Sequence, residues 1–142
     1  MDDALRIRIM PWSEARPEAQ PIRETVFVVE QGVPPEIELD EWDERSEHAI
    51  AYDFAGRPMG TGRLLPDGHI GRMAVLRESR GLGIGARLLE ALVDRARARG
   101  MRRVALNAQT HAAPFYARFG FTVAGQEFME AGIPHVAMER AL

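Results

Sequence analysis

Cysteine is absent from the sequence. Its absence excludes disulfide bonds, zinc sites built on thiolates and a cysteine nucleophile. Long apolar runs are absent too, since no stretch approaches the length that spans a bilayer. The start, Met1-Asp2-Asp3, is acidic rather than typical of a secretion signal. We therefore expect a cytoplasmic protein that does not associate with a membrane.

An excess of basic residues is also missing. The net charge is −3 and the isoelectric point is about 5.8, whereas nucleic-acid-binding proteins usually carry a basic surface. We expect no nucleic-acid partner, which disfavours a phosphate-binding regulator of nucleic acid. The four histidines show no metal-ligand spacing, and no Asp/Glu cluster pairs with them in a recognisable motif, so we also expect no metal.

The remaining composition is ordinary for a globular protein, with 46% apolar and 27% charged residues. No repeat, low-complexity segment or linker divides the 142 residues, and this length suffices for one sizeable core. We expect a single domain over residues 1–142.

The spacing of apolar residues predicts the order of strands and helices. Residues 5–9 alternate as in a half-buried strand, and residues from about 17 to 31 show helical spacing that Gly32 and the following prolines end. An acidic segment, residues 36–47, leaves room for a short second helix. Three β-rich runs separated by turn signals then predict an antiparallel meander. The predicted strands of the meander are residues 48–54, 59–65 and 69–76, and the later elements are a helix at 83–99 ending at Gly100, a strand at 103–108, a short helix at 112–119 and strands at 121–128 and 134–139.

The most informative motif is Arg80-Gly81-Leu82-Gly83-Ile84-Gly85, which stands between a predicted strand and an amphipathic helix. Glycine lets a backbone approach a ligand closely. The free N–H groups of the first helical turn and the helix dipole favour an anion in front of them. Arg80 adds a fork of donors suited to phosphate oxygens. The motif predicts a pyrophosphate cradle; the alternative is a tight turn without a ligand.

The position of this motif excludes two common phosphate-binding folds. A dinucleotide-binding fold carries its glycines after the first strand, whereas here they follow roughly four strands. A P-loop requires Gly-Lys-Ser/Thr, and the loop contains no lysine.

Two motifs together resemble the GNAT superfamily of acyl-CoA-dependent N-acetyltransferases. Arg80-x-x-Gly83-x-Gly85 matches the acetyl-CoA motif of that family, and the segment 115–121, with Tyr116 on a short helix before Gly-Phe, matches its second motif. Residues 22–32 and 108–111 look like the ElaA/YjcF-like branch. The resemblance covers essentially the whole chain. It implies an α+β (mixed α/β) fold with a central mixed, mainly antiparallel sheet flanked by helices, in the order β-α-β-β-β-α-β-α-β-β.

The resemblance also implies where the cosubstrate acetyl-CoA binds. In this family pantetheine lies like an extra strand between the strand before the glycine loop and the next strand. The resemblance also implies cofactor contact at Gln109, a position where many relatives have Asn. Many members form homodimers, which leaves that assembly open for this chain. The resemblance implies that pantetheine binds to the backbone of Met73, Ala74 and Val75. It implies that an amide near Val75 polarises the thioester carbonyl. The residues implied to hold the pyrophosphate are Arg80, Gly81, Leu82, Gly83, Ile84, Gly85 and Ala86.

Tyr116 is the expected general acid, which gives a proton to the departing CoA thiolate. The alternative is an aromatic side chain that only packs the short helix against the core. Because the chain has no cysteine, we expect direct attack of the amine on the thioester in a ternary complex. The attacking amine must lose a proton, and a surface or capping role is the alternative for each candidate base. The candidates for the base or the acceptor site are Glu30, Asp40, Glu41, His48 and His111.

Residues 36–44 are acidic and contain Trp42. They form either a solvated face or a surface that attracts a cationic acceptor, which would be a small-molecule amine or a peptide amine. Trp12 and Arg63 have only packing and surface charge as expected roles. The leading hypothesis is an acetyl-CoA-dependent N-acetyltransferase. The alternative is a non-catalytic acyl-CoA-binding sensor or interaction module of the same fold.

Overall fold

The computed structural model describes residues 5–142, so the acidic start Met1-Asp2-Asp3 lies outside the described residues. Strands and helices alternate largely as the sequence predicts. In chain order they are β1 (Arg6–Pro11), α1 (Trp12–Arg23), a π-helix (Glu24–Glu30), α2 (Pro35–Glu38), β2 (Glu47–Tyr52), β3 (Pro58–Leu64), β4 (Ile70–Val75), α3 (Ile84–Ala98), β5 (Arg103–Gln109), α4 (Ala113–Ala117), β6 (Thr122–Val123), β7 (Phe128–Glu130) and β8 (Ile133–Ala141), with short 3₁₀ turns at Asp43–Arg45, Arg77–Ser79 and Thr110–Ala112.

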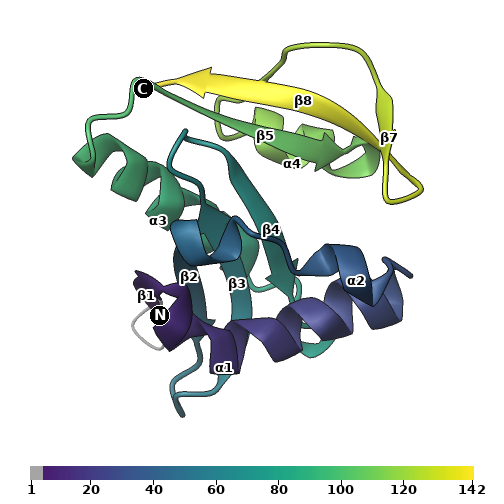
Figure 1. Cartoon of the computed structure of the whole chain (residues 1–142). Coiled ribbons are helices and arrows are strands. Elements are labelled where there is room, and N and C mark those ends of the chain that lie inside the picture. Colours follow the sequence, from purple (N-terminus) through teal and green to yellow (C-terminus); the bar gives the residue numbers. More distant parts are fainter. Residues whose placement is uncertain (1–4) are drawn as a thin grey trace.

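The strands form two sheets that part from each other (Figure 1). One sheet has the antiparallel order β1-β2-β3-β4, which confirms the predicted meander. The other has the order β5-β8-β6, with β7 also paired to β8. Within residues 5–142 a single parallel bridge, His69 to Ala105, joins β4 to β5. The α+β class and the mainly antiparallel strands are as expected.

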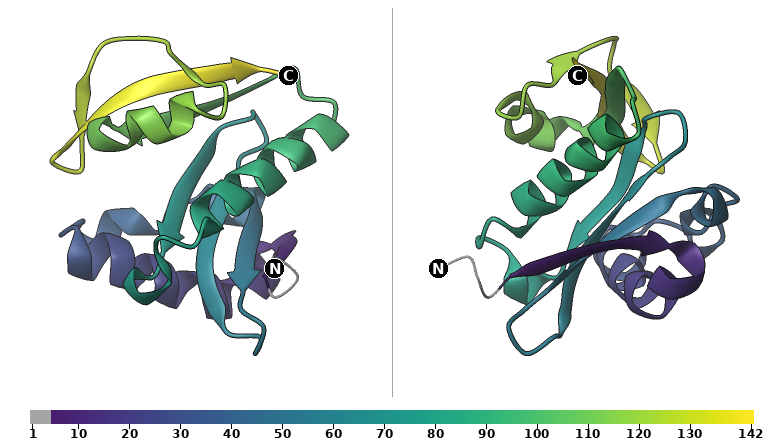
Figure 2. Two further views of the ribbon diagram at one scale, coloured as in Figure 1. Left: turned by 180° about the vertical axis from the view of Figure 1, so that it is seen from behind. Right: turned by 90° about the vertical axis from the view of Figure 1, so that its left-hand side faces the viewer.

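Helices cover both faces of the first sheet: α3 packs on one face and α1 on the other (Figure 2). Side chains of β2 alternate between the two, since Ala49 and Ala51 belong to the α3 core and Ile50 to the α1 core. Small residues on the α3 face let the helix approach closely. A Cβ at Gly60 would lie 3.0 Å from Leu88 Cδ1, so the packing of α3 depends on this glycine.

The first helix begins at Trp12, earlier than the predicted start near residue 17. Trp12 and Ala15 are buried against β2, and this packing outweighs the two prolines, Pro17 and Pro21, inside the helix. Each proline removes one backbone donor from the helical hydrogen bonds. After them the chain continues as a wider π-helix over Glu24–Glu30, with the N–H of Gln31 bonded to the carbonyl of Val26.

The predicted strand at 121–128 is interrupted. Val123 pairs with Met138, and Phe128 pairs with His135. Between these two pairs, the four residues 124–127 lie opposite only the two residues 136–137 of β8. Two extra residues must therefore leave the ladder, which is more than the single extra residue of an ordinary bulge. Only β6 and β7, at the two ends of the predicted strand, are regular.

A bulge bends β4 just after its bridge to β5. Thr61 pairs with Ala74 and Arg63 with Gly71, so β4 carries one residue more than β3 in this interval. Arg72 takes a left-handed φ of +49°, which costs a non-glycine residue about 1–2 kcal/mol. Its side chain compensates by donating from Nε to the Glu38 carbonyl at 3.1 Å and from Nη2 to Asp40 at 3.1 Å.

Buried ion pairs join α1, α2 and β3. Arg23 donates to the Glu38 carboxylate at 2.6 Å and to Asp43 at 2.7 Å, and Arg63 donates to Asp43 at 2.9 Å. Burial alone raises the pKa of Asp43, but the hydrogen bond and charge of Arg23 outweigh it and hold the pKa below its usual 3.8. The interpretation of residues 36–44 as a solvated face is therefore wrong for Glu38 and Asp43, and Arg63 is buried rather than a surface charge.

Two aromatic contacts complete this region. The Arg23 guanidinium lies 5.1 Å from the centre of the Trp12 ring, and the same ring lies 4.8 Å from the buried His48 ring. Trp12 thus covers the ion pairs from the α1 side, and its role is packing, as the sequence predicts.

Replacement of Asp43 by asparagine should lower the free energy of unfolding by about 3–5 kcal/mol, because two buried guanidinium groups then lose a carboxylate partner. Urea unfolding followed by circular dichroism measures this loss. Asp94→Asn is the matched control, because Asp94 forms an exposed pair with Arg97, and such pairs contribute less than about 1 kcal/mol. Equal losses in the two variants would contradict a structural role for the buried network.

Candidate functional site

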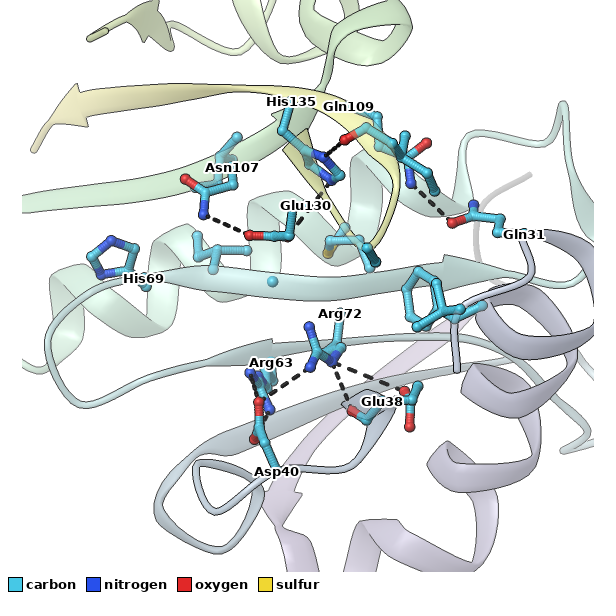
Figure 3. Close-up of a pocket in the computed structure, with 18 of the residues that line it drawn as sticks. Gln31, Glu38, Asp40, Arg63, His69, Arg72, Asn107, Gln109, Glu130 and His135 are labelled. Atoms are coloured by element: carbon cyan, nitrogen blue, oxygen red, sulfur yellow. Dashed lines mark hydrogen bonds and ion pairs between the residues drawn. The ribbon is translucent and has the colours of Figure 1, made fainter. Parts of the chain in front are cut away.

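A cavity of about 610 Å³ lies where the two sheets part. Strands β4 and β5, helix α4, the β7–β8 hairpin and the segment around α2 all contribute to its wall. The labelled side chains other than His69 fall into two groups on either side of one strand (Figure 3). Arg63, Arg72, Asp40 and Glu38 form one group, and the other consists of Asn107, Glu130, His135, Gln109 and Gln31.

The slot expected to hold pantetheine is open along β4. β3 occupies one edge of β4, and in the described part of the chain the other edge pairs with β5 only at the His69 bridge. Met73 lines the cavity from β4, and Leu106 lines it from β5. Backbone groups that lack a strand partner need another one, so the open edge suits an extended, hydrogen-bonding ligand. Ala74 is buried under α1, and Val75 ends the strand.

The glycine loop has the geometry of an anion cradle. Gly81 and Gly83 have φ of +82° and +77°, and a Cβ at either would meet no atom within 4 Å, so the space in front of the loop is open. Gly83 caps α3 without a side-chain hydrogen bond, and the first turn, beginning at Ile84, carries no acidic residue. Its backbone N–H groups therefore remain available to an anion. A Cβ at Gly85 would lie 3.8 Å from Phe115 and 4.0 Å from Val75, so the loop adjoins the end of the β4 slot.

Arg80 is held at the start of this loop by Glu30. Its Nη1 and Nη2 donate to the two carboxylate oxygens at 3.0 and 2.9 Å, and its Nε donates to the Val75 carbonyl at 2.9 Å. The hydrogen bond from Arg80 is the main reason that the pKa of Glu30 lies below its usual value. Glu30 does not line the cavity, and its ion pair ties the π-helix to the loop.

Tyr116 lines the cavity from α4. Its ring makes edge contacts with Phe115 and Phe121, and burial raises the pKa of its hydroxyl, so the phenol stays protonated at neutral pH. The geometry thus shows the packing role, and it places Tyr116, with its hydroxyl protonated, in the cavity wall. Gln109 also lines the cavity, and it donates to the side-chain oxygen of Gln31 at 2.9 Å.

Of the five candidate bases, only Asp40 lines the cavity. Burial alone raises the pKa of Asp40, but hydrogen bonding to Arg63 at 2.7 Å, with the charges of Arg63 and Arg72, lowers it overall. His48 is buried, and its Nε2 contacts the Asp43 carbonyl at 2.8 Å; burial lowers its pKa. Glu41 and His111 are exposed and lie outside the cavity wall.

Several polar residues of the wall were not predicted from the sequence, and three of them lie together at the β7–β8 hairpin and the neighbouring strand β5. His135 lies on β8 with its Nε2 3.6 Å from a carboxylate oxygen of Glu130, and Asn107 donates to Glu130 at 3.4 Å (Figure 3). A usable signal existed: Ala131-Gly132 between two predicted β segments is a short turn that pairs Glu130 with Ile133. Recognising that hairpin would have placed His135 and Glu130 on neighbouring strands.

Within the described range, 5–142, no three His, Cys, Asp or Glu side chains are grouped so as to hold a metal ion. Across the same range, no helix combines the length and apolar character that crossing a membrane requires.

Comparison with known proteins identifies the family. The acetyltransferase (GNAT) domain model matches residues 16–142. A relative from Bacillus subtilis (strain 168), named as the uncharacterized N-acetyltransferase YjcF, is 44% identical over 121 residues, which cover 82% of this chain and 86% of that protein.

Two solved structures match nearly the whole fold. An acyl-CoA N-acyltransferase from Pseudomonas aeruginosa is 30% identical with a TM-score of 0.86, and the match covers 96% of this chain and 99% of that one. Escherichia coli ElaA is 26% identical with a TM-score of 0.84 over the same shares of each chain. These matches confirm the expected ElaA/YjcF-like branch. Together with the open β4 edge and the glycine loop, they show that the chain belongs to the GNAT family of acetyltransferases, whose fold implies an acyl-CoA donor and an amine acceptor.

Proposed function

We propose that this protein transfers an acetyl group from acetyl-CoA to a primary amine, by direct attack in a ternary complex. The observation that carries the proposal is the continuity of three features. The open glycine loop at Gly81 and Gly83 adjoins the end of β4, the free edge of β4 leads into the cavity, and Tyr116 lines that cavity and keeps its hydroxyl protonated. A site with these parts can hold a phosphate-bearing thioester and protonate its leaving group.

The residues act in sequence along this path. The N–H groups at the start of α3, with Arg80, hold the pyrophosphate, and the backbone of Met73, Ala74 and Val75 holds pantetheine along the open edge. An amide near Val75 polarises the thioester carbonyl, which matters most as charge develops on its oxygen. The amine nitrogen forms the new C–N bond, the C–S bond breaks, and Tyr116 gives its proton to the sulfur.

The charge of the cavity bears on the acceptor. Glu38 and Asp43 are each paired with arginine, and Asp40 is shared between Arg63 and Arg72. These carboxylates have less capacity to attract a cation than the sequence of residues 36–44 suggests. We therefore propose an amine acceptor, either a small molecule or a peptide amine, that is drawn into the cavity by other groups.

The proposal is tested by incubating the pure protein with acetyl-CoA and a panel of amino acids, polyamines, simple aliphatic amines and short peptides. Release of CoA together with an acetylated amine supports it. The chain contains no lysine, so acetylation of its own lysine side chains cannot contribute to CoA release. Binding of acetyl-CoA without transfer to any amine would instead favour the non-catalytic acyl-CoA-binding module.

Gly83→Ala should weaken acetyl-CoA binding by about tenfold or more, because a methyl group there enters the open space in front of α3 and is strained at a φ of +77°. The loss of one charge-assisted hydrogen bond, about 1.5–3 kcal/mol, corresponds to a factor of this size. Isothermal titration calorimetry with acetyl-CoA measures it.

Two matched variants separate lost phosphate contacts from backbone strain. Gly100 has a similar φ of +78° and open space at Cβ, but it follows the C-terminal end of α3, so Gly100→Ala should leave acetyl-CoA affinity unchanged. Gly85 lacks a positive φ, and its Cβ would make only ordinary contacts, so Gly85→Ala should be milder than Gly83→Ala. An affinity of Gly83→Ala equal to that of the wild type would rule out the loop as the pyrophosphate site.

Tyr116→Phe should lower kcat by about 10²-fold or more and leave the Kd for acetyl-CoA nearly unchanged, because only proton donation is lost. The ring remains to pack on Phe115 and Phe121. Steady-state kinetics and calorimetry measure the two constants, with circular dichroism as the check of folding. Wild-type turnover in the folded variant would leave Tyr116 with its packing role alone.

A further inference from the structure

The β7–β8 hairpin holds its tip at a defined place in the cavity wall. Its turn residues, Ala131 and Gly132, have φ of +51° and +77°, as in tight two-residue hairpin turns. Alanine in this conformation costs about 1–2 kcal/mol, so the paired strands must hold the turn. Glu130 and Ile133 flank it as a cross-strand pair, and both line the cavity.

The backbone sets the protonation of the His135 ring. Its Nδ1 lies 2.7 Å from the Ile133 carbonyl oxygen. A carbonyl oxygen only accepts hydrogen bonds, so Nδ1 must carry the proton. In the neutral ring Nε2 therefore presents a lone pair. The ring is also stacked on Phe128, with the ring centres 6.0 Å apart and the planes at 25°, which fixes its orientation.

The register of the second sheet places the His135 side chain on the cavity side. His135 pairs with Gln109 of β5 on one side and with Phe128 of β7 on the other. Side chains that are directly opposite in an antiparallel ladder share a face, and both Gln109 and His135 line the cavity. Met73 and Tyr116 line the same cavity, in which the thioester and the leaving group are proposed to lie.

Glu130 differs from the other carboxylates of this region because it is not part of their ion pairs with arginine. Glu38, Asp40 and Asp43 are paired with Arg23, Arg63 and Arg72, which makes three carboxylates and three guanidinium groups. Glu130 contacts no arginine among the described residues; its partners there are Asn107 at 3.4 Å and His135 Nε2 at 3.6 Å. A protonated imidazole, or an ammonium group entering the cavity, would complete its pairing.

We propose that His135 is the general base of the transfer, and that Glu130 positions an ammonium acceptor and stabilises the imidazolium that forms. The inference rests on the function proposed above and names a residue outside the five candidate bases. It also defines the acceptor as an aliphatic amine that arrives protonated, since an amine that is already neutral would not need this base.

The proton balance of the step is complete. The ammonium gives one proton to His135 Nε2 and becomes the neutral amine, whose nitrogen forms the C–N bond to the thioester carbon. The C–S bond breaks, and the sulfur takes the proton of Tyr116. The second proton lost by the nitrogen restores the phenol of Tyr116, and His135 releases the first proton to solvent. The products are the acetamide, CoA thiol and one proton.

Other ionisable groups face this cavity from each packed element, and Glu130 of β7 is the one that contacts the imidazole. β5 contributes only the neutral Asn107 and Gln109 next to it. The remaining ionisable side chains of the wall are Glu38, Asp40, Arg63, His69, Arg72 and Tyr116.

The state of the ring is measured without any acceptor. Nitrogen-15 NMR of the wild-type protein, with His135→Gln used for assignment, should show His135 as the Nδ1–H tautomer in its neutral form. A dominant Nε2–H tautomer would overturn the proposal, because the cavity would then face a donor rather than a lone pair.

The catalytic role is measured with two acceptors that differ in their protonation state at neutral pH. One is the most active aliphatic amine of the panel, which is protonated at neutral pH, as for a lysine amine with a pKa near 10.4; the other is hydroxylamine, which is mainly neutral there. His135→Gln should lower kcat/KM for the aliphatic amine by about 10²-fold or more and remove the fall of kcat/KM at low pH. The loss with hydroxylamine should be at least tenfold smaller. Glu130→Gln should mainly raise KM for the aliphatic amine.

His111→Gln is the matched variant, because His111 is exposed and lies outside the cavity; the fall at low pH should persist in it. Equal losses with both acceptors in His135→Gln would show a structural role for His135, and loss of the low-pH fall in His111→Gln would move the base there; either result overturns the proposal. Absence of transfer by the wild type would instead contradict the proposed function.

Discussion

The parting of β4 from β5 is the constraint on which the rest of this structure depends. The two strands touch at the His69–Ala105 bridge and then separate, which leaves backbone groups along both edges without strand partners. A sheet normally satisfies these groups within the chain. Here the split creates a slot that an extended substrate can complete, with the glycine loop at one end and a cavity along its length.

The split is held by polar interactions that carry a large desolvation cost. The left-handed Arg72 in the β4 bulge bends the strand, and its side chain is tied to the segment around Glu38 and Asp40. That segment is in turn held by Arg23 and Arg63 through buried carboxylates. Buried charges are stable only when each is paired, so α1, α2, β3 and β4 are coupled. The acidic segment that looked like a docking surface is largely internal structure.

The two walls of the cavity therefore differ in their electrostatics. On the side of Arg63 and Arg72, positive and negative charges balance and are held by several hydrogen bonds each. On the side of the β7–β8 hairpin, Glu130 and His135 are left facing the cavity with few partners. A group that must gain or lose a proton has to keep such freedom, because a charge locked by two arginines strongly resists protonation.

The resemblance of two motifs indicated the family, and the order of elements and the position of the glycine loop before a helix follow from the sequence alone. These features depend on local spacing: Gly81 and Gly83 next to a helix start, and apolar residues at periods of two or 3.6. The start of α1 at Trp12 depended instead on burial against β2, and the break between Val123 and Phe128 depended on the length of β8. Which carboxylates pair with arginine was decided by tertiary structure, because Arg23 and Arg63, the partners of Glu38 and Asp43, lie 15 to 20 residues away along the chain. The pairing of His135 with Glu130 likewise arose from strand register, which brings together side chains that the sequence separates by a turn.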